Sequence, residues 1–412
     1  MASNGIFEWE RPLVELEKRL NELRAFNEEE GMQLSDEIAF LERRAQRLRE
    51  EIYRNLTPWQ RVMMARHSGR PTFLDYVPLI FEDFVELHGD RKAGDDGAMV
   101  GGIARFDGRP VTIIGTQKGR DTKENLRRNF GLPHPEGYRK ALRLMKQAEK
   151  FGRPVITFID VVGAFPGIEA EQRGQGVAIA ENIMAMSGLR TPIVCVVTGE
   201  GGSGGALAIG VGDRVYMLEH AWYSVISPEM CATILWRDSS RAPEAASILR
   251  LTAQDLVEFG VIDGVIPEPP GGAHRDKVQT AQAVKEAIRA ALQELSMLSI
   301  DELVEQRYRR YRNMGVWGMA GEARSPDESA ELSELAQQTP KGAGTPTPSG
   351  AGEPEPAGAA PATGPEAGGH GTGPALPNGA ATEPIGAARE EGRGRRGFRR
   401  GGPREPGRSP RR

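Results

Sequence analysis

The sequence has almost no cysteine and no long apolar run. Among its 412 residues are two cysteines, Cys195 and Cys231, and neither belongs to a C-x-x-C pair. That pattern excludes a disulfide framework and a cysteine metal knuckle, and we expect both side chains to be buried in a reducing compartment. No stretch reaches 18 apolar residues, and no charged segment followed by an apolar run opens the chain. We therefore expect a soluble, cytoplasmic protein.

Large side chains are scarce in the C-terminal part of the chain. Residues 341–388 contain 12 Gly, 9 Pro and 12 Ala among 48 residues, a composition that has little to bury and predicts disorder. Residues 389–412 contain ten Arg against three acidic residues, a net charge of +7, whereas the whole chain carries −4. We predict three parts: a helical hairpin at 1–60, an α/β domain at 61–321 and a disordered tail at 322–412.

The hairpin is predicted from a narrow stripe of apolar residues. Such residues recur at steps of three and four on both sides of a break near Gly31, with charged residues between them. This rhythm is typical of helices that pack on another helix, in the same chain or in a partner subunit. The stripe consists of Leu13, Leu16, Leu20, Leu23, Leu34, Ile38, Leu41, Ala45, Leu48, Ile52 and Leu56.

From about residue 72 the pattern becomes that of an α/β protein. Apolar segments at 100–106 and 111–115 flank Asp107-Gly108, which predicts a β-hairpin. Further strands are predicted at 155–160, 192–198 and 214–219, and helices at 137–151 and 168–188. Because helices alternate with strands that end in glycine-rich loops, we expect the functional site at the strand ends.

One of these loops is exceptionally rich in glycine. Residues 199–205 read Gly-Glu-Gly-Gly-Ser-Gly-Gly, between a predicted buried strand and a short apolar segment from Ala206. Glycines there let bare backbone N–H groups approach a ligand at the start of a helix. The pattern favours a site for a small developing negative charge, such as an enolate oxygen.

Two other interpretations of this loop exist. Gly199, Gly201 and Gly204 match the G-x-G-x-x-G dinucleotide fingerprint, with Glu219 as the acidic residue, but Gly210 interrupts the following helix too early for a crossover helix. A purely structural glycine turn is the third possibility. A P-loop is excluded, since no Lys-Ser/Thr pair follows the glycines.

Several long segments of the chain resemble one protein family. They are residues 100–105, 127–131, 135–145, 199–212 and 223–229. Together they resemble the alpha subunit of bacterial acetyl-CoA carboxylase carboxyltransferase, a crotonase-superfamily protein, and the likeness runs from about residue 6 to 312. The resemblance implies an α/β, crotonase-like (ClpP/crotonase) spiral core at 61–321.

The resemblance also implies an activity. In that family carboxyl moves from carboxybiotin on a carrier protein to acetyl-CoA, giving malonyl-CoA, the first step of fatty acid synthesis. Negative charge develops on the ureido oxygen of biotin, where fixed N–H donors stabilise it. Biotin N1 then takes the α-proton of acetyl-CoA, so no protein base is required. Val161, Val162 and Phe165 depart from the residues usual in the family, which leaves a different acyl-CoA as an alternative.

The resemblance also implies which residues of this chain form the functional site. Gly204 and Gly205 correspond to the two N–H donors of the oxyanion hole. Residues expected to line the substrate site come from the two glycine-rich loops: Gly163, Ala164, Phe165, Gly167, Gly201, Gly202 and Ser203.

The family also implies partners for this chain. They are a beta subunit that binds acetyl-CoA and carries a zinc ribbon, in an α2β2 complex, together with biotin carboxyl carrier protein and biotin carboxylase. This chain itself is expected to bind no metal or cofactor and no membrane, and carboxybiotin is its co-substrate.

Three further features have two interpretations each. His134 and His220 have no Ser or Asp partner placed by a motif, and we interpret both as structural rather than catalytic. A cationic set either meets CoA phosphates or an acidic partner, or forms a solvated face; it consists of Lys118, Arg120, Lys123, Arg127 and Arg128. The Arg/Gly-rich segment at 393–402 resembles nucleic-acid-binding segments, or it is a solubilising appendage.

Overall fold

The computed structural model describes residues 6–30 and 34–315. All of them lie in the first of two compact units, residues 1–323, and the second unit, residues 324–412, falls outside the described residues. The predicted tail at 322–412 therefore stays a prediction, as do the domain boundaries at 60 and 321. No helix in the described ranges is long and apolar enough to cross a membrane.

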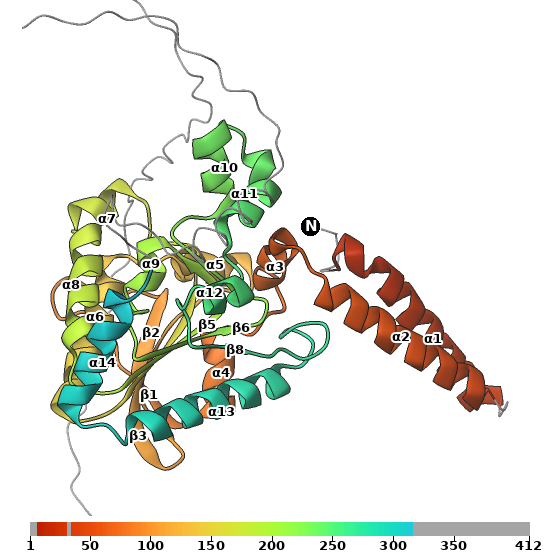
Figure 1. Ribbon diagram of the computed structural model, residues 1–412, viewed down its shortest axis with the longest axis horizontal. Helices are drawn as coiled ribbons and strands as arrows, with labels where there is room; N and C mark the ends of the chain where they lie inside the picture. The colour runs from red at the N-terminus through yellow and green to blue at the C-terminus, as the bar shows by residue number, and fades with distance from the viewer. Residues whose placement is uncertain (1–5, 31–33, 316–412) are drawn as a thin grey trace, which may run out of the picture. The chain divides into compact units, whose positions relative to one another are not determined.

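Eight strands in the described residues form one sheet (Figure 1). They are β1 (Glu82–Glu86), β2 (Met99–Phe106), β3 (Arg109–Thr116), β4 (Val155–Val161), β5 (Ile193–Gly202), β6 (Arg214–Leu218), β7 (Trp222–Ser224) and β8 (Gly264–Ile266). The strand order is β1-β2-β3-β4-β5-β6-β8, and β7 pairs with the end of β5. The first three strands are antiparallel and the pairs from β3 to β8 are parallel.

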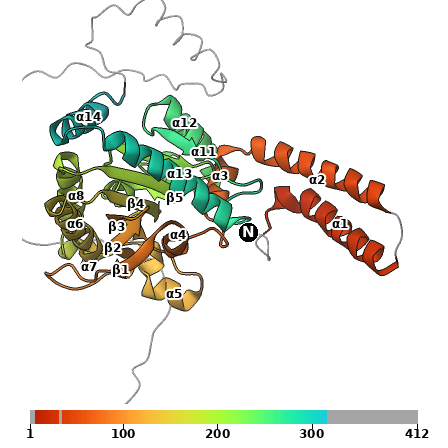
Figure 2. The same ribbon diagram turned by 90° about the horizontal axis from the view of Figure 1, so that it is seen from below.

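Helices connect and cover these strands. The α-helices are α1 (Arg11–Glu30), α2 (Ser35–Arg54), α3 (Pro58–Ala65), α4 (Phe73–Ile80), α5 (Thr122–Arg127), α6 (Pro135–Lys150), α7 (Ile168–Gln172), α8 (Gln175–Gly188), α9 (Ser203–Leu207), α10 (Pro228–Trp236), α11 (Ala242–Leu249), α12 (Ala253–Glu258), α13 (Lys277–Leu295) and α14 (Ile300–Arg312). Short 3-10 helices cover Glu8–Glu10, Asn129–Gly131 and Ser239–Arg241. Helices α6 and α8 lie side by side in both views (Figures 1 and 2).

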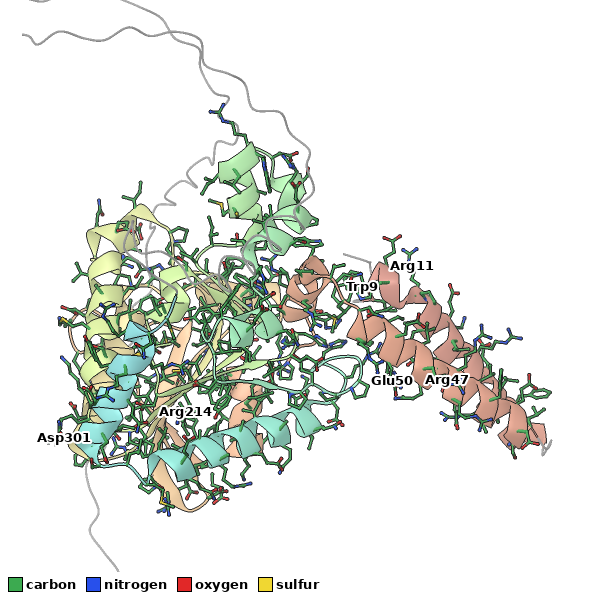
Figure 3. The ribbon with its side chains drawn as sticks, in the orientation of Figure 1. Trp9, Arg11, Arg47, Glu50, Arg214 and Asp301 are labelled. Carbon is green, nitrogen blue, oxygen red and sulfur yellow. The ribbon has the colours of Figure 1, made fainter. Side chains whose placement is uncertain are left out.

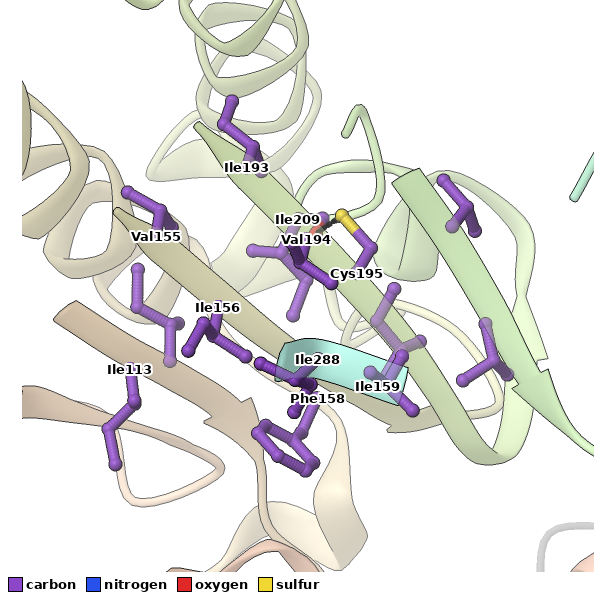
Figure 4. Packing of buried hydrophobic residues seen from close by; sticks show 14 of the residues in the cluster. Ile113, Val155, Ile156, Phe158, Ile159, Ile193, Val194, Cys195, Ile209 and Ile288 are labelled. Carbon is purple, nitrogen blue, oxygen red and sulfur yellow. Dashed lines mark hydrogen bonds between the residues drawn. The ribbon is translucent and has the colours of Figure 1, made fainter. Parts of the chain in front are cut away.

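The core lies around the central parallel strands. Every residue of β4 and β5 is buried, and because successive side chains point to opposite faces, both faces of these strands must be covered. Figure 4 shows isoleucine and valine side chains from β4 and β5 packed together, with Ile288 of α13 beside Phe158. Cys195 is buried among them as an unpaired thiol, as predicted.

Most predicted elements are present, with two corrections. The turn at Asp107-Gly108 has φ of 48° and 77° and joins β2 to β3, so the predicted hairpin is confirmed. The helix predicted at 168–188 is wrong as one unit, because Gly174 adopts a left-handed φ of 81° and separates α7 from α8. The strand predicted at 192–198 is too short, because β5 continues to Gly202.

Helices α1 and α2 lie side by side in the region of the predicted hairpin (Figure 2). Arg49 of α2 pairs with Glu17 of α1 at 2.5 Å. Exposed charged residues such as Arg47 and Glu50 lie along α2 (Figure 3). A small hydrophobic core, separate from that of the sheet, joins α1 and α2 to α3. It consists of Phe7, Leu13, Ala45, Tyr53, Leu56 and Met64.

A fully buried ion pair attaches α14 to the sheet. Arg307 binds both oxygens of Asp213 at 2.8 Å and also donates to the carbonyl oxygens of Met186, Leu189 and Thr191. Asp213 in turn accepts a hydrogen bond from the Ile193 amide at 2.7 Å, at the first residue of β5. The guanidinium therefore joins α8, α14 and the amino end of β5.

Replacing this arginine tests its structural role. We expect Arg307→Ala to lower the free energy of unfolding by about 3–5 kcal/mol, because it leaves Asp213 as a buried, unpaired charge. Urea denaturation of the purified chain measures this. The matched control, Arg309→Ala, removes an exposed pair with Glu305 on the same helix and should change stability by no more than about 0.5 kcal/mol. Equal losses in the two variants would contradict the assignment.

Candidate functional site

Two glycine-rich segments meet where β4 and β5 end. Val161 of β4 is paired with Gly201 of β5. A Cβ atom on Gly202 would overlap the carbonyl group of Val162, and one on Gly205 would stand 2.5 Å from the amide nitrogen of Ala164. Both separations are shorter than any side chain tolerates, so the two backbones approach each other as only glycine allows. The two segments therefore lie together through residues 162–164 on one side and Gly202 and Gly205 on the other.

The glycine segment 199–205 is a strand end and a helix start rather than a loop. Gly201 and Gly202 pair with Tyr223 and Ser224 of β7, and α9 begins directly at Ser203. Sequence reasoning assigned these glycines to a loop, because glycine is uncommon in strands and the pairing with β7 comes from a separate segment. Helix α9 has five residues, which is too short for the crossover helix of a dinucleotide site.

Ser203 is the turning point between strand and helix. Its φ is +56°, a left-handed conformation that is uncommon for a residue with a side chain. Ser203 is exposed and Gly204 is half-buried, whereas Gly205 is buried. The amides of Gly204 and Gly205 lie in the first turn of α9, where N–H groups have no partner within the helix. At such a position, backbone N–H groups bond to acceptors outside the helix.

The second segment, after β4, forms one side of this region. Adding a Cβ to Gly163 would meet no atom within 4 Å, so open space lies beside this residue. Ala164 packs on the core, and its amide lies against Gly205. Phe165 stacks on His134 with ring centroids 4.0 Å apart, and Gly167 lies under the same ring. Phe165 is thus held against His134, and Gly167 lies against Phe165.

The two histidines are held in structural hydrogen bonds. His134 is the N-cap residue of α6, and its ring nitrogen Nδ1 lies 3.3 Å from Asp96 Oδ2 and 3.0 Å from Asn129. His134 also contributes to the lining of a cavity of about 320 Å³. His220 is buried beside Arg61, and burial lowers the pKa of its imidazole. His134 thus has Asp96 as a partner that no sequence motif indicated, and the interpretation of both histidines as structural stays a prediction.

Sequence reasoning missed a group of charged residues beside the glycine segment. Lys118 Nζ donates to Asp160 Oδ1 at 2.6 Å and to Glu200 Oε2 at 2.7 Å, and Arg66 Nε donates to Glu200 Oε1 at 2.6 Å. We call these four residues the charge cluster. A signal was present in the sequence, since Asp160 and Glu200 are acidic residues at the ends of strongly apolar strands.

Mutual attraction keeps Glu200 and Lys118 of this cluster ionised. Burial by itself would raise the pKa of Glu200, but the nearby charges of Lys118 and Arg66 outweigh it and lower the pKa to about 2. Burial would likewise lower the pKa of Lys118, and the carboxylates of Asp160 and Glu200 instead raise it to about 12. Glu200 and Lys118 are therefore both charged at neutral pH.

The predicted cationic set is largely occupied by contacts within the chain. Lys118 belongs to the charge cluster, Arg120 pairs with Asp75, and Arg128 donates to the Gly97 carbonyl oxygen at 2.9 Å. Lys123 is exposed on α5. A single solvated face made of all five residues is therefore wrong.

Comparison with known proteins identifies the class. A model for acetyl co-enzyme A carboxylase carboxyltransferase-like proteins matches residues 6–315. The acetyl-coenzyme A carboxylase carboxyl transferase subunit alpha of Halalkalibacterium halodurans is 57% identical over 318 residues, covering 77% of this chain and 98% of the relative. The protein of the same name from Thermus thermophilus is 57% identical over 310 residues, covering 75% and 98%.

Similar solved structures include the transcarboxylase 12S, with 21% identity and a TM-score of 0.45. That match covers 62% of this chain and 44% of the other, so the chain spans less than half of that protein. A Pseudomonas malonate decarboxylase hetero-tetramer in complex with coenzyme A has 17% identity and a TM-score of 0.45, covering 60% and 93%.

The sequence matches are sufficient to assign the chain to a family. It belongs to the acetyl co-enzyme A carboxylase carboxyltransferase-like family. Within that family its curated relatives are alpha subunits, so the chain is an enzyme subunit, and its core is an α/β sheet covered by helices. The resemblance inferred from the sequence is confirmed.

The close backbone approach at Gly202 leads to a stability prediction. We expect Gly202→Ala to lower the free energy of unfolding by about 3 kcal/mol, the upper end for overpacking, because the new methyl group overlaps Val162. Gly163→Ala is the matched control at a position with open space, and it should cost almost nothing. Chemical denaturation of both variants measures the difference, and a Gly202→Ala protein as stable as wild type would argue against the observed packing.

Proposed function

We propose that this chain forms the biotin side of a carboxyltransferase that moves carboxyl from carboxybiotin to acetyl-CoA and so forms malonyl-CoA. The proposal rests on the family match and on relatives named acetyl-coenzyme A carboxylase alpha subunits. The alignments with these relatives cover nearly their whole length. Formation of malonyl-CoA opens fatty acid synthesis, and the enzyme acts in the cytoplasm.

The amides of Gly204 and Gly205 are the proposed oxyanion-hole donors. One observation carries this assignment: both lie in the first turn of α9, next to the exposed Ser203, where their N–H groups have no helical partner. Fixed N–H donors stabilise a developing oxyanion without reorganising. Gly201, Gly202, Ser203 and the segment Gly163, Ala164, Phe165 and Gly167 are the proposed lining of the substrate site.

Carboxybiotin supplies the carboxyl group, and its ureido oxygen gains charge as that group leaves. The chain's part in this step is to present N–H groups and to keep their positions fixed. It needs no acid or base of its own, which agrees with the structural roles of His134 and His220. In this proposal, backbone N–H groups held in fixed positions do the work that a side-chain acid or base does in other enzymes.

A complete enzyme requires other subunits. The family implies a beta partner and biotin-carrier components. We propose an α2β2 complex in which the beta subunit binds acetyl-CoA and carries the zinc, with carboxybiotin delivered by the carrier protein and regenerated by biotin carboxylase. No cofactor is bound directly by this chain.

A bulky residue at position 204 tests the donor assignment. We expect Gly204→Val, in complex with the beta subunit, to lose about 10²–10³-fold in kcat for carboxyl transfer, because the branched side chain displaces an oxyanion donor. The fold should survive, since a Cβ at this position meets only Ile179 at ordinary contact distance, 3.5 Å. Malonyl-CoA formation is measured alongside thermal unfolding.

The control for that variant makes the same change elsewhere. Gly188 is exposed at the end of α8, and an added Cβ meets nothing within 4 Å. Gly188→Val should therefore keep wild-type turnover. Wild-type turnover in Gly204→Val as well would remove Gly204 from the site.

A second candidate function concerns the tail. Residues 389–412 have ten Arg, three acidic residues and an Arg/Gly-rich segment at 393–402, a composition that attracts nucleic acid by neutralising phosphates and stacking on bases. We expect the full-length chain to bind RNA with an affinity that falls steeply as salt rises. Deleting 322–412 should abolish that binding and leave carboxyl transfer intact; equal RNA binding after the deletion would exclude the tail.

A further inference from the structure

The glycine segment has few side chains of its own that could fix its backbone. Between 199 and 205 only Glu200 and Ser203 are not glycine, and Ser203 is exposed. Glycine backbones have more conformational freedom than any other, so ordering them costs more entropy. A backbone that must present two amides in fixed directions therefore needs restraint from neighbouring residues.

Glu200 is the one residue in this segment whose side chain is anchored. Both of its carboxylate oxygens are engaged, one by Arg66 and the other by Lys118. Its own amide donates to Asp160 Oδ1 at 2.9 Å. Side chain and backbone of Glu200 are thus both fixed, one residue before Gly201.

Asp160 extends the same restraint to the neighbouring strands. Its Oδ1 accepts hydrogen bonds from Lys118 Nζ and from the Glu200 amide. Its own amide donates to Thr116 Oγ1 at 2.7 Å. Gly199 leaves the space that this carboxylate fills, since a Cβ there would overlap Asp160 Oδ1. The carboxyl ends of β3, β4 and β5 are consequently tied at one point.

Arg66 connects that point to a further element. Besides Glu200 it binds Glu229 in the first turn of α10, with Nη2 3.3 Å from Oε2. The exposed fractions of the Asp160 and Glu200 side chains are 8% each, and that of Lys118 is 22%. Contacts this shielded from water are weakened less by salt than surface ion pairs.

We infer that Lys118, through Asp160 and Glu200, is a positioning residue that holds the 201–205 backbone in the geometry that its amides need. Lys118 acts through these carboxylates and the strand ends rather than on the substrate. The inference rests on the proposed function, because it assigns a purpose to the geometry of the proposed donors.

The test replaces Lys118 by methionine, an uncharged side chain of similar length. In the full-length chain with its beta subunit, Lys118→Met should lower kcat for carboxyl transfer by about 10²-fold, the loss expected when reacting groups are misplaced by about 1 Å. The KM for acetyl-CoA should stay unchanged, since the beta subunit binds that substrate. Lys118→Arg keeps the charge and should recover a large part of kcat.

Hydrogen exchange provides a readout independent of activity. Amides in peptides covering 196–207 should exchange faster in Lys118→Met than in wild type, while peptides from α13 should be unchanged. Lys146→Met makes the same substitution at an exposed position of α6 and should alter neither kcat nor exchange. If Lys118→Met fails to fold, Glu200→Gln is measured instead, because it removes the charge and keeps the shape.

The outcomes separate this inference from the proposed function. Wild-type kcat and wild-type exchange in Lys118→Met would overturn the positioning role. If the wild-type complex transfers no carboxyl but exchange at 196–207 still rises in the variant, the restraint by Lys118 is supported and the proposed function fails. Equal effects of Lys118→Met and Lys146→Met would also overturn the inference.

Discussion

The contact between two glycine-containing strand ends determines how this site is built. Gly202 and Gly205 lie directly on the backbone of residues 162–164, with no side chains between them. Such an approach brings the start of α9 close to the segment after β4. It also removes from that region the side chains that would normally fix a backbone, so the restraint must come from the charge cluster at the strand ends. The close backbone packing and the ion pairs of the charge cluster therefore act together to fix this region.

Local patterns were sufficient to predict much of this fold. The β-hairpin around Asp107 and the strand at 155–160 depend on turn chemistry and apolar runs, which are visible in a single sequence. The separation of α7 from α8 depends on the left-handed Gly174, which the sequence does not distinguish from a glycine tolerated inside a helix. Residues 199–202 were assigned to a loop because their strand character comes from β7, a partner more than twenty residues away.

For the site too, the sequence indicated features that depend on a local motif and missed contacts between residues far apart in the chain. The family motif indicated Gly204 and Gly205, and the structure places both in the first turn of a helix, beside an exposed residue. Lys118 was grouped with neighbouring cations because its sequence neighbours are cationic, whereas its partners lie 42 and 82 residues further along. Ion pairs between strand ends follow from sheet order, and sheet order was not available from the sequence.

The charge cluster also has a consequence for how substrates reach this face. Arg66 and Lys118 both contact Glu200 in the glycine segment, and both are neutralised by Asp160, Glu200 and Glu229. They therefore contribute little to long-range attraction of an anion. Under the proposed function, capture of a negatively charged co-substrate at this face would then depend on short-range fit and on delivery by a tethered carrier, and the rate of encounter would follow the carrier's reach rather than ionic strength.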